Sequence, residues 1–141
     1  MTQPRPLVSV VMGVRNGAAS LEATLASLTH GQDLDLEILV INDGSTDQTG
    51  PLLQRLAGDD RRIRVLNREG RGLTRALIEG CAEARGLFIA RQDAGDRSLP
   101  ERLERQVACL EADPGANLCS CHVRLVVEEG ARSEEHTSEL Q

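Results

Sequence analysis

Three aspartates that follow short apolar runs are the strongest candidates for chemistry in this 141-residue sequence. Asp43 ends one such run, Asp93 and Asp96 follow another, and Arg15 with Asn16 follows a third. Carboxylates brought close together repel one another unless a cation or hydrogen-bond donors lie between them. A divalent cation that carries a diphosphate, or the hydroxyls of a ribose, would satisfy such a group of acids.

The apolar runs that precede these residues predict the strands of a sheet. Residues 8–14 are almost wholly apolar, as is typical of a strand buried on both faces, and residues 37–42, 63–66 and 87–91 predict three more strands. A last strand is expected at about residues 117–127. Segments with helical spacing of apolar residues separate the strands, so the alternation predicts an α/β fold with a mostly parallel sheet.

Capping residues predict where the helices begin and end. Ser20 is expected to cap the first helix and Gly31 to end it. Ser98 and Glu101 have the spacing of a capping box before the last helix. Spacing also predicts which helix residues are buried: Leu21, Leu25 and Leu28 in the first helix, Leu52, Leu53 and Leu56 in the second, Leu73, Leu77 and Ala84 in the third, and Leu103, Val107 and Leu110 in the fourth.

The expected sheet brings the three aspartates together. Parallel strands place their carboxyl ends at one edge, and open α/β sheets bind ligands outside that edge. We therefore expect Asp43 to lie near Asp93 and Asp96. Each acid alone has a plainer interpretation, as a turn residue that caps the next helix. Convergence of all three favours a binding site.

Composition excludes several other nucleotide-binding classes. All 16 basic residues are arginine, so the lysine of a P-loop or of a phosphoacceptor receiver domain is missing. The end of the first strand and the residues after it contain only Gly13 and Gly17, which does not match the glycine pattern of a dinucleotide fold. A net charge of −6 and a single aromatic residue, Phe88, argue against nucleic-acid binding.

The four cysteines are expected to serve packing. Cys81 and Cys109 fall on predicted apolar helix faces, where a free cysteine acts as a small buried hydrophobe. Cys119, Cys121 and His122 have no second ligand pair at the spacing of a zinc site, which favours core packing for them too.

The end of the sequence is expected to lie outside the fold. Residues 132–141 lack strand or helix periodicity and resemble a translated sequencing adapter, so they are interpreted as a non-native or disordered tail after a domain at residues 1–131. The chain starts without a signal-peptide core, and we expect a cytoplasmic protein. Membrane association is expected only through a part that would follow the domain.

Five segments resemble family 2 glycosyltransferases, in the order that this family has them. Residues 8–17 resemble its opening strand, and residues 40–47, Val-Ile-Asn-Asp-Gly-Ser-Thr-Asp, are similar to its second-strand signature. Residues 71–77 resemble the entry to its third helix, residues 85–96 its Asp-X-Asp segment, and residues 99–103 the sequence that follows. One motif alone would be weak, but the ordered set covers residues 6–127 and is specific.

The resemblance implies a Rossmann-like GT-A nucleotide-sugar-binding fold, here truncated. It implies that Val14, Arg15 and Asp43 hold the base of a nucleotide-diphosphate sugar. It also implies that Asp93 contacts the ribose or the metal side of the diphosphate, and Arg71 is expected to neutralise charge on the departing diphosphate.

The implied cofactor is a divalent metal, Mg²⁺ or Mn²⁺, with Asp93 and Asp96 as candidate ligands. Gly95 stands where this family has the second acid of Asp-X-Asp, and Asp96 lies one residue further on. Gly13 and Arg15 replace the usual proline and tyrosine of the first-strand motif. The planar guanidinium of Arg15 would stack on the base in place of an aromatic ring.

The implied activity is transfer of a sugar to an unknown acceptor of the cell-surface polysaccharide or glycolipid type. In this family the catalytic base, which deprotonates the acceptor hydroxyl, and the acceptor-binding elements lie downstream of the expected last strand. This fragment itself is therefore expected to be inactive. Glu128 and Glu129 are interpreted as a solvated turn. Two alternatives stay open: a non-catalytic nucleotide-binding remnant and an α/β interaction domain.

Overall fold

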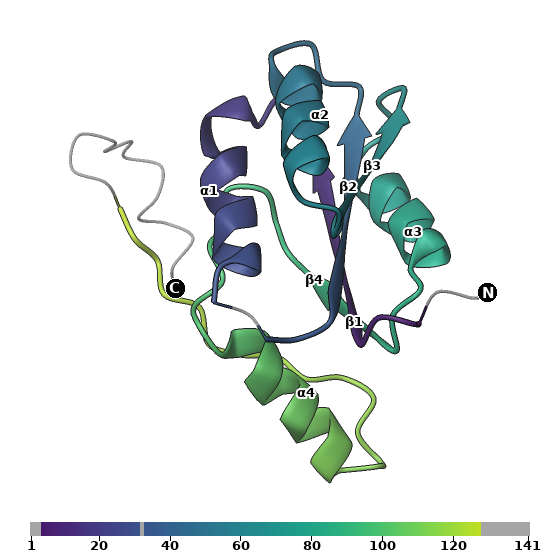
Figure 1. Ribbon diagram of the computed structural model, residues 1–141, viewed down its shortest axis with the longest axis vertical. Helices are drawn as coiled ribbons and strands as arrows, with labels where there is room; N and C mark the ends of the chain where they lie inside the picture. The colour runs from purple at the N-terminus through teal and green to yellow at the C-terminus, as the bar shows by residue number, and fades with distance from the viewer. Residues whose placement is uncertain (1–3, 32, 128–141) are drawn as a thin grey trace.

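The computed structural model describes residues 4–31 and 33–127, and in them a four-stranded sheet with four helices (Figure 1). The strand order is β3-β2-β1-β4 and every pairing is parallel, which confirms the α/β prediction. The expectations for residues 132–141 and for Glu128 and Glu129 fall outside the described residues. The elements are β1 (Val8–Val14), α1 (Ala18–Thr29), β2 (Leu36–Asp43), α2 (Thr49–Asp59), β3 (Ile63–Arg68), α3 (Leu73–Glu83), β4 (Phe88–Arg91) and α4 (Arg102–Ala112).

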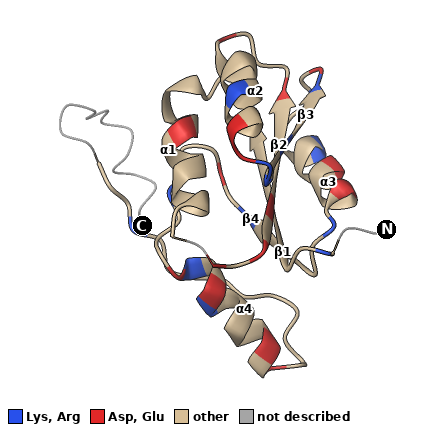
Figure 2. Ribbon diagram, viewed as in Figure 1, with Lys and Arg blue, Asp and Glu red and all other residues tan. Residues whose placement is uncertain are grey.

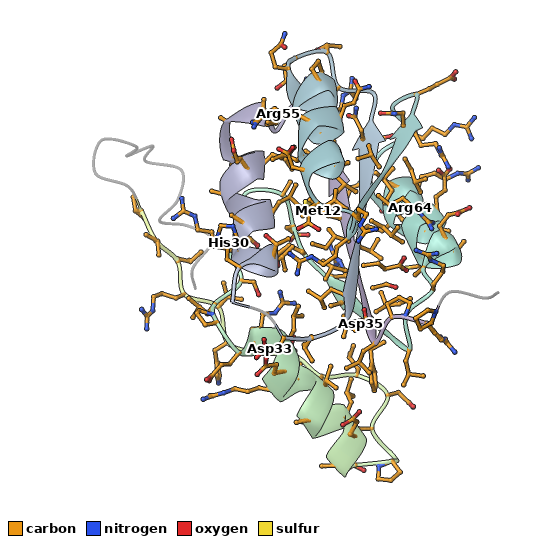
Figure 3. The ribbon with its side chains drawn as sticks, in the orientation of Figure 1. Met12, His30, Asp33, Asp35, Arg55 and Arg64 are labelled. Carbon is orange, nitrogen blue, oxygen red and sulfur yellow. The ribbon has the colours of Figure 1, made fainter. Side chains whose placement is uncertain are left out.

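Helices cover both faces of the sheet, with α1 and α2 on one side and α3 on the other (Figure 1). Side chains alternate between faces along a strand. Met12 of β1 therefore lies in the layer between the sheet and α1 with α2, while Arg64 of β3 points to the side of α3 (Figure 3). Every residue of β1 and β2 is buried, which explains why these strands read as nearly continuous apolar runs.

The larger core lies on the face of α1 and α2 and includes apolar residues of α4. Leu103 and Val107 of α4 join Leu25 of α1 and Leu53 of α2 there, as their spacing predicts. The smaller core lies under α3, where Ala76 and Gly80 are buried. A Cβ on Gly80 would meet Val11 Cγ1 at 2.5 Å, so α3 packs too close to the sheet for any side chain at that position. Across residues 4–31 and 33–127, no helix has the length and apolar character to cross a membrane.

Both predicted side-chain caps are wrong. Ser20 lies inside α1, which begins after Gly17, and α4 begins at Arg102 after Glu101 in a left-handed conformation, with no side-chain cap. The hydroxyl of Ser98 instead accepts a hydrogen bond from the Arg102 guanidinium at 3.3 Å. At α1 the first amides instead donate to side chains that follow β2, and such tertiary contacts leave no local sequence signature.

The expected last strand is also wrong within the described residues. Residues 117–127 belong to no strand, and their apolar side chains are exposed, with Leu118 at 87%. An extended segment becomes a strand only when a neighbour takes up its backbone hydrogen bonds, and none of the described strands pairs with it.

The expectation of buried cysteines is wrong for most of them. Cys81 and Cys109 lie on solvent-facing sides of α3 and α4, Cys121 is exposed, and Cys119 is partly buried. Partial burial comes first among the causes that raise the pKa of the Cys119 thiol, followed by the neighbouring Cys109 and Cys121.

Candidate functional site

A cavity of about 460 Å³ opens at the carboxyl ends of β1 and β2. Its walls come from the loop after β1, the end of β2, the start of α3 and the segment after β4. This is the edge at which the parallel sheet predicts a ligand. The cavity is lined by Gly13, Val14, Arg15, Asn16, Gly17, Ser20, Asp43, Gly72, Leu73, Ala76, Asp93 and Ala94.

Most of the predicted site residues lie at this cavity. Asp43 and Asp93 line it together, although they come from strands that are not neighbours, so the expected meeting of these two acids holds in the structure. Val14 and Arg15 line it as well. Arg71 and Asp96 are not among its lining residues, although the backbone amide of Arg71 contacts Asp43.

Asp43 is held in place by backbone amides. Its side chain is buried, and its two carboxylate oxygens accept hydrogen bonds from the amides of Arg71 at 2.9 Å and of Gly72 at 2.8 Å. Hydrogen bonds to a carboxylate stabilise its charged form. Asp43 therefore fixes the loop before α3 while it presents a negative group to the cavity.

The turn after Asp43 depends on a close backbone approach. Gly44 has a φ of 73°, a conformation that favours glycine. A Cβ at this position would also lie 2.9 Å from the backbone nitrogen of Gly70. The Asp43–Gly44 turn and the loop before α3 therefore pack directly against each other, and only glycine at position 44 allows it.

The side chain of Asn16 joins the loop after β1 to the loop after β2. Its Oδ1 accepts hydrogen bonds from the backbone amides of Thr46 at 2.7 Å and of Asp47 at 3.2 Å. In return, the amide of Asn16 donates to Ser45 Oγ at 3.0 Å. Asn16 itself has a φ of 53°, which asparagine tolerates better than most residues. The two loops therefore form one cross-linked wall of the cavity.

The same loops replace a side-chain cap at the start of α1. The amide of Gly17 donates to Thr49 Oγ1 at 2.9 Å, and the amide of Ala18 donates to Asp47 Oδ2 at 3.4 Å. Hydrogen bonds from Thr49 hold the pKa of the Asp47 carboxyl below its ordinary value, since they favour the ionised form. The acids and hydroxyls of residues 45–49 thus serve α1 as well as α2.

Helical spacing predicts that Leu73 is buried in the core, but its side chain instead forms an apolar part of the cavity wall. Its side chain is 52% exposed. A Cβ on Gly13 would lie 2.8 Å from Leu73 Cδ1 and 3.4 Å from the Cβ of Ala76. Leu73 therefore occupies the space that a side chain at position 13 would need. Helical periodicity alone could not reveal this, because Leu73 is the first residue of α3 and lies at the carboxyl edge of the sheet.

The segment after β4 carries Asp93 on an exposed turn. The Asp93 carboxylate accepts a hydrogen bond from the Arg91 guanidinium at 3.1 Å, and both side chains are more than half exposed. Gly95 has a φ of 99°, and its amide donates to Thr24 Oγ1 of α1 at 3.1 Å. The amide of Asp96 donates to the Asp93 carbonyl, which closes the turn.

The acids of this edge do not form a closed metal cage. No group of three potential metal ligands occurs among residues 4–31 and 33–127. Asp93 is the one acid of the Asp-X-Asp segment that lines the cavity. A Mg²⁺-like cation that also binds substrate phosphates needs only one or two carboxylates from the protein. A single carboxylate at the cavity, that of Asp93, is therefore compatible with a cation that a diphosphate also binds.

The sequence and the fold both match known glycosyltransferases. Residues 9–138 match the family described as "Glycosyl transferase family 2". An uncharacterized glycosyltransferase of Haemophilus influenzae is 32% identical over 124 residues, which cover 87% of this chain and 38% of the relative. The chain thus spans well under half the length of that relative.

Two solved structures share the fold. The mannosyltransferase PcManGT from Pyrobaculum calidifontis, in complex with GDP-Man and Mn²⁺, matches with a TM-score of 0.70 and 28% identity, over 79% of this chain and 34% of its own. S. aureus TarS 1–349 in complex with UDP matches with a TM-score of 0.68 and 24% identity, over 75% of this chain and 32% of its own, a likeness of fold.

Proposed function

The chain belongs to glycosyl transferase family 2, and on that premise we propose that it is the donor-binding part of a glycosyltransferase that uses a nucleotide-diphosphate sugar. One observation carries the proposal. Asp43 and Asp93 follow different strands, yet both line a single cavity at the carboxyl edge of a parallel sheet. Two turns that merely capped their own helices would have no reason to share it.

The base of the nucleotide would lie beside Asp43, Val14 and Arg15. Each Asp43 oxygen accepts one backbone amide, and a carboxylate oxygen can accept two hydrogen bonds, so one acceptor site on each remains for an N–H group of the base. Arg15 is exposed at the rim, with its guanidinium close to Gly70. A planar guanidinium can stack on a base from there.

The diphosphate would lie between Asp93 and the start of α3. A Mg²⁺ or Mn²⁺ ion bound by Asp93 would neutralise charge on the departing diphosphate. PcManGT, which shares the fold, is in complex with GDP-Man and Mn²⁺. The exposed Arg71 side chain would add positive charge at the loop whose amides hold Asp43.

We propose a cell-surface polysaccharide or glycolipid as the acceptor of the transferred sugar. Transfer also needs a base that takes a proton from the acceptor hydroxyl. We assign no described residue to that role, and we propose that the 141-residue chain binds the donor without transferring sugar. Incubation of the purified chain with a radiolabelled nucleotide sugar and a mixture of acceptors tests this, and any labelled product would refute it.

Calorimetric titration tests donor binding. UDP-GlcNAc and GDP-Man are titrated with Mn²⁺ present, and we expect one of them to bind. Asp93→Asn should weaken that binding about tenfold, the effect of losing one interaction with a charged group. Asp96→Asn removes the same charge three residues away, outside the cavity, and should change little. Absence of heat with both nucleotide sugars would favour an α/β interaction domain.

The conformation of Gly95 favours a second candidate, a non-catalytic nucleotide-binding remnant. A φ of 99° is one that other residues adopt only with strain, so the acid usual at this position would cost stability here. Gly95→Asp is compared with Gly95→Ala, which carries the same strain without the carboxylate. A Mn²⁺-dependent gain in nucleotide affinity for Gly95→Asp alone would support the transferase, and no gain would support the remnant.

A further inference from the structure

Arg102, the first residue of α4, donates hydrogen bonds to the start of the segment that carries Asp93. Its guanidinium donates to Gln92 Oε1 at 2.8 Å and to the backbone carbonyl of Arg91 at 3.0 Å. It also donates to Ser98 Oγ at 3.3 Å and to Gln106 Oε1 at 3.2 Å. A planar group with five donors can serve several acceptors in fixed directions at once, which lysine cannot.

Gln92 is the residue through which Arg102 would act on Asp93. It is 4% exposed, and its amide donates to the Val11 carbonyl at 3.2 Å, which extends the pairing of β4 with β1 by one residue. In an extended chain, successive side chains point in opposite directions. With the Gln92 side chain held toward α4 by Arg102, the next side chain, Asp93, faces the cavity.

The other contacts of this segment lie further along the chain. The amides of Gly95 and Ser98 donate to Thr24 Oγ1 and Ser27 Oγ of α1, at 3.1 Å and 2.9 Å. Asp93 itself has the exposed Arg91 as its side-chain partner. An exposed ion pair of this kind contributes little to stability. The hydrogen bonds of Arg102 therefore add to the pairing with β1 and are the side-chain contacts that hold the chain just before Asp93.

We propose that Arg102 is a positioning residue for donor binding, which it performs without touching the donor. It holds Gln92 and the Arg91 carbonyl, and thereby sets where the Asp93 carboxylate meets the diphosphate. Arg102 is not among the residues that line the cavity. The inference rests on the proposed function for its effect on binding, and on the structure alone for its effect on the segment.

The binding test compares Arg102→Gln with Arg105→Gln. Helix α4 carries charges of both signs along its length (Figure 2). Arg105 on the same helix is 81% exposed, and its guanidinium pairs with Glu101 one turn earlier. Both variants lose one positive charge. UDP and uridine, or GDP and guanosine if GDP is the ligand, are titrated with MnCl₂ present.

We expect Arg102→Gln to weaken binding of the nucleotide about tenfold and to leave binding of the nucleoside unchanged. The part of the cavity proposed to hold the base is fixed by separate hydrogen bonds at Asp43. Arg105→Gln should change neither, and Arg102→Lys should fall between wild type and Arg102→Gln. An equal loss for nucleoside and nucleotide, or no loss for either, would overturn the proposal, since a general loss of folding would act on both.

A second measurement needs no ligand, so it separates this inference from the proposed function. Hydrogen exchange of the backbone amides should become faster at Gln92 and Asp96 in Arg102→Gln, and stay unchanged at Arg71 and Gly72. If wild type binds no nucleotide and this pattern is still seen, the proposed function fails, while the hold of Arg102 on the segment stands. Unchanged exchange at Gln92 refutes the positioning role.

Discussion

Two acids on β2, Glu37 and Asp43, are almost equally buried but have opposite surroundings. Glu37 is 4% exposed near the amino end of the strand, and Asp43 is 5% exposed at its carboxyl end. The Glu37 carboxylate accepts hydrogen bonds from Ser9 Oγ at 2.5 Å, from the Arg85 amide at 2.6 Å and from the Arg85 guanidinium at 3.1 Å. The partners of Asp43 in the described part of the chain are two backbone amides of the loop before α3.

The comparison distinguishes an acid whose partners lie inside the fold from an acid that we propose to serve a site. Burial raises the pKa of Glu37, but the hydrogen bonds from Ser9 and Arg85 together with the Arg85 charge outweigh it, and the net pKa is lowered. The charge of Glu37 is thus neutralised inside the protein. Asp43 borders a cavity and has no cationic side-chain partner among the described residues, so a ligand can complete its environment.

Removal of the Glu37 carboxylate should have the largest effect on stability. Glu37→Ala leaves the Ser9 hydroxyl and the Arg85 amide without their acceptor, and we expect a loss of about 3 kcal/mol in the free energy of unfolding. Urea unfolding measures it, with Glu83→Ala as the control, because Glu83 pairs with Arg64 on the surface. Nucleotide affinity should not change. A loss of affinity would end the distinction between the two acids.

Asp43→Asn should lower the stability of the protein less than Glu37→Ala does, but it should lower the affinity for the nucleotide more. The amide group replaces one acceptor oxygen with a donor that faces a backbone N–H, so we expect a loss of about 1 kcal/mol in unfolding free energy. The affinity for the nucleotide should fall at least tenfold, as measured by calorimetry. Affinity equal to that of wild type would show that Asp43, like Glu37, serves only the fold.

A comparison of Gly44→Ala with Gly31→Ala should separate two causes of lost stability. One is the steric clash at the site, and the other is the strain of a positive φ. Gly44 and Gly31 both have positive φ, 73° and 67°, but a Cβ on Gly31 would meet nothing within 4 Å. We expect Gly31→Ala to cost about 1 kcal/mol and Gly44→Ala about 1 kcal/mol more, measured by thermal unfolding. Equal losses of stability in the two variants would mean that the turn after Asp43 can shift to accommodate a Cβ at position 44.

The smallest expected effect is a dependence of stability on pH through Glu37. Its folded pKa lies below the ordinary value of 4.5, so the unfolded chain binds the proton first as the solution is acidified. The stability contributed by ionised Glu37 is complete above pH 4.5 and is lost as the pH falls through the folded pKa. The difference in unfolding free energy between wild type and Glu37→Gln should therefore shrink below pH 4.5, and a difference that grows there would reverse the sign of the argument.

The sheet and its site edge were predictable because burial on both faces leaves a plain signal. The residues of β1 must all be apolar or small, and the acid that ends β2 must then lie at the carboxyl edge. Asp43 and Asp93 were placed at one edge on these grounds. The ordered motifs added the family, which the matched residues 9–138 confirm.

What the sequence did not predict depends on partners distant along the chain. Ser20 looks like a cap, yet the amides at the start of α1 donate to Thr49 and Asp47. Ser98 looks like a cap too, but its hydroxyl accepts a hydrogen bond from the Arg102 side chain. Glu37 offered a signal that was missed, because an acid between apolar strand residues requires a buried partner. The role of Arg102 had no local signal, since both of its main acceptors lie on another element.

The contact between Gly13 and Leu73 has a consequence for how this protein can change over generations. A side chain at position 13, such as the proline usual in family 2 glycosyltransferases, would collide with Leu73 Cδ1. Leu73 Cδ1 is the far end of a flexible side chain that is 52% exposed, so a shift of this side chain can relieve the collision. Relatives that carry proline at the first position should therefore carry either a smaller residue at the second or a leucine turned away from the strand.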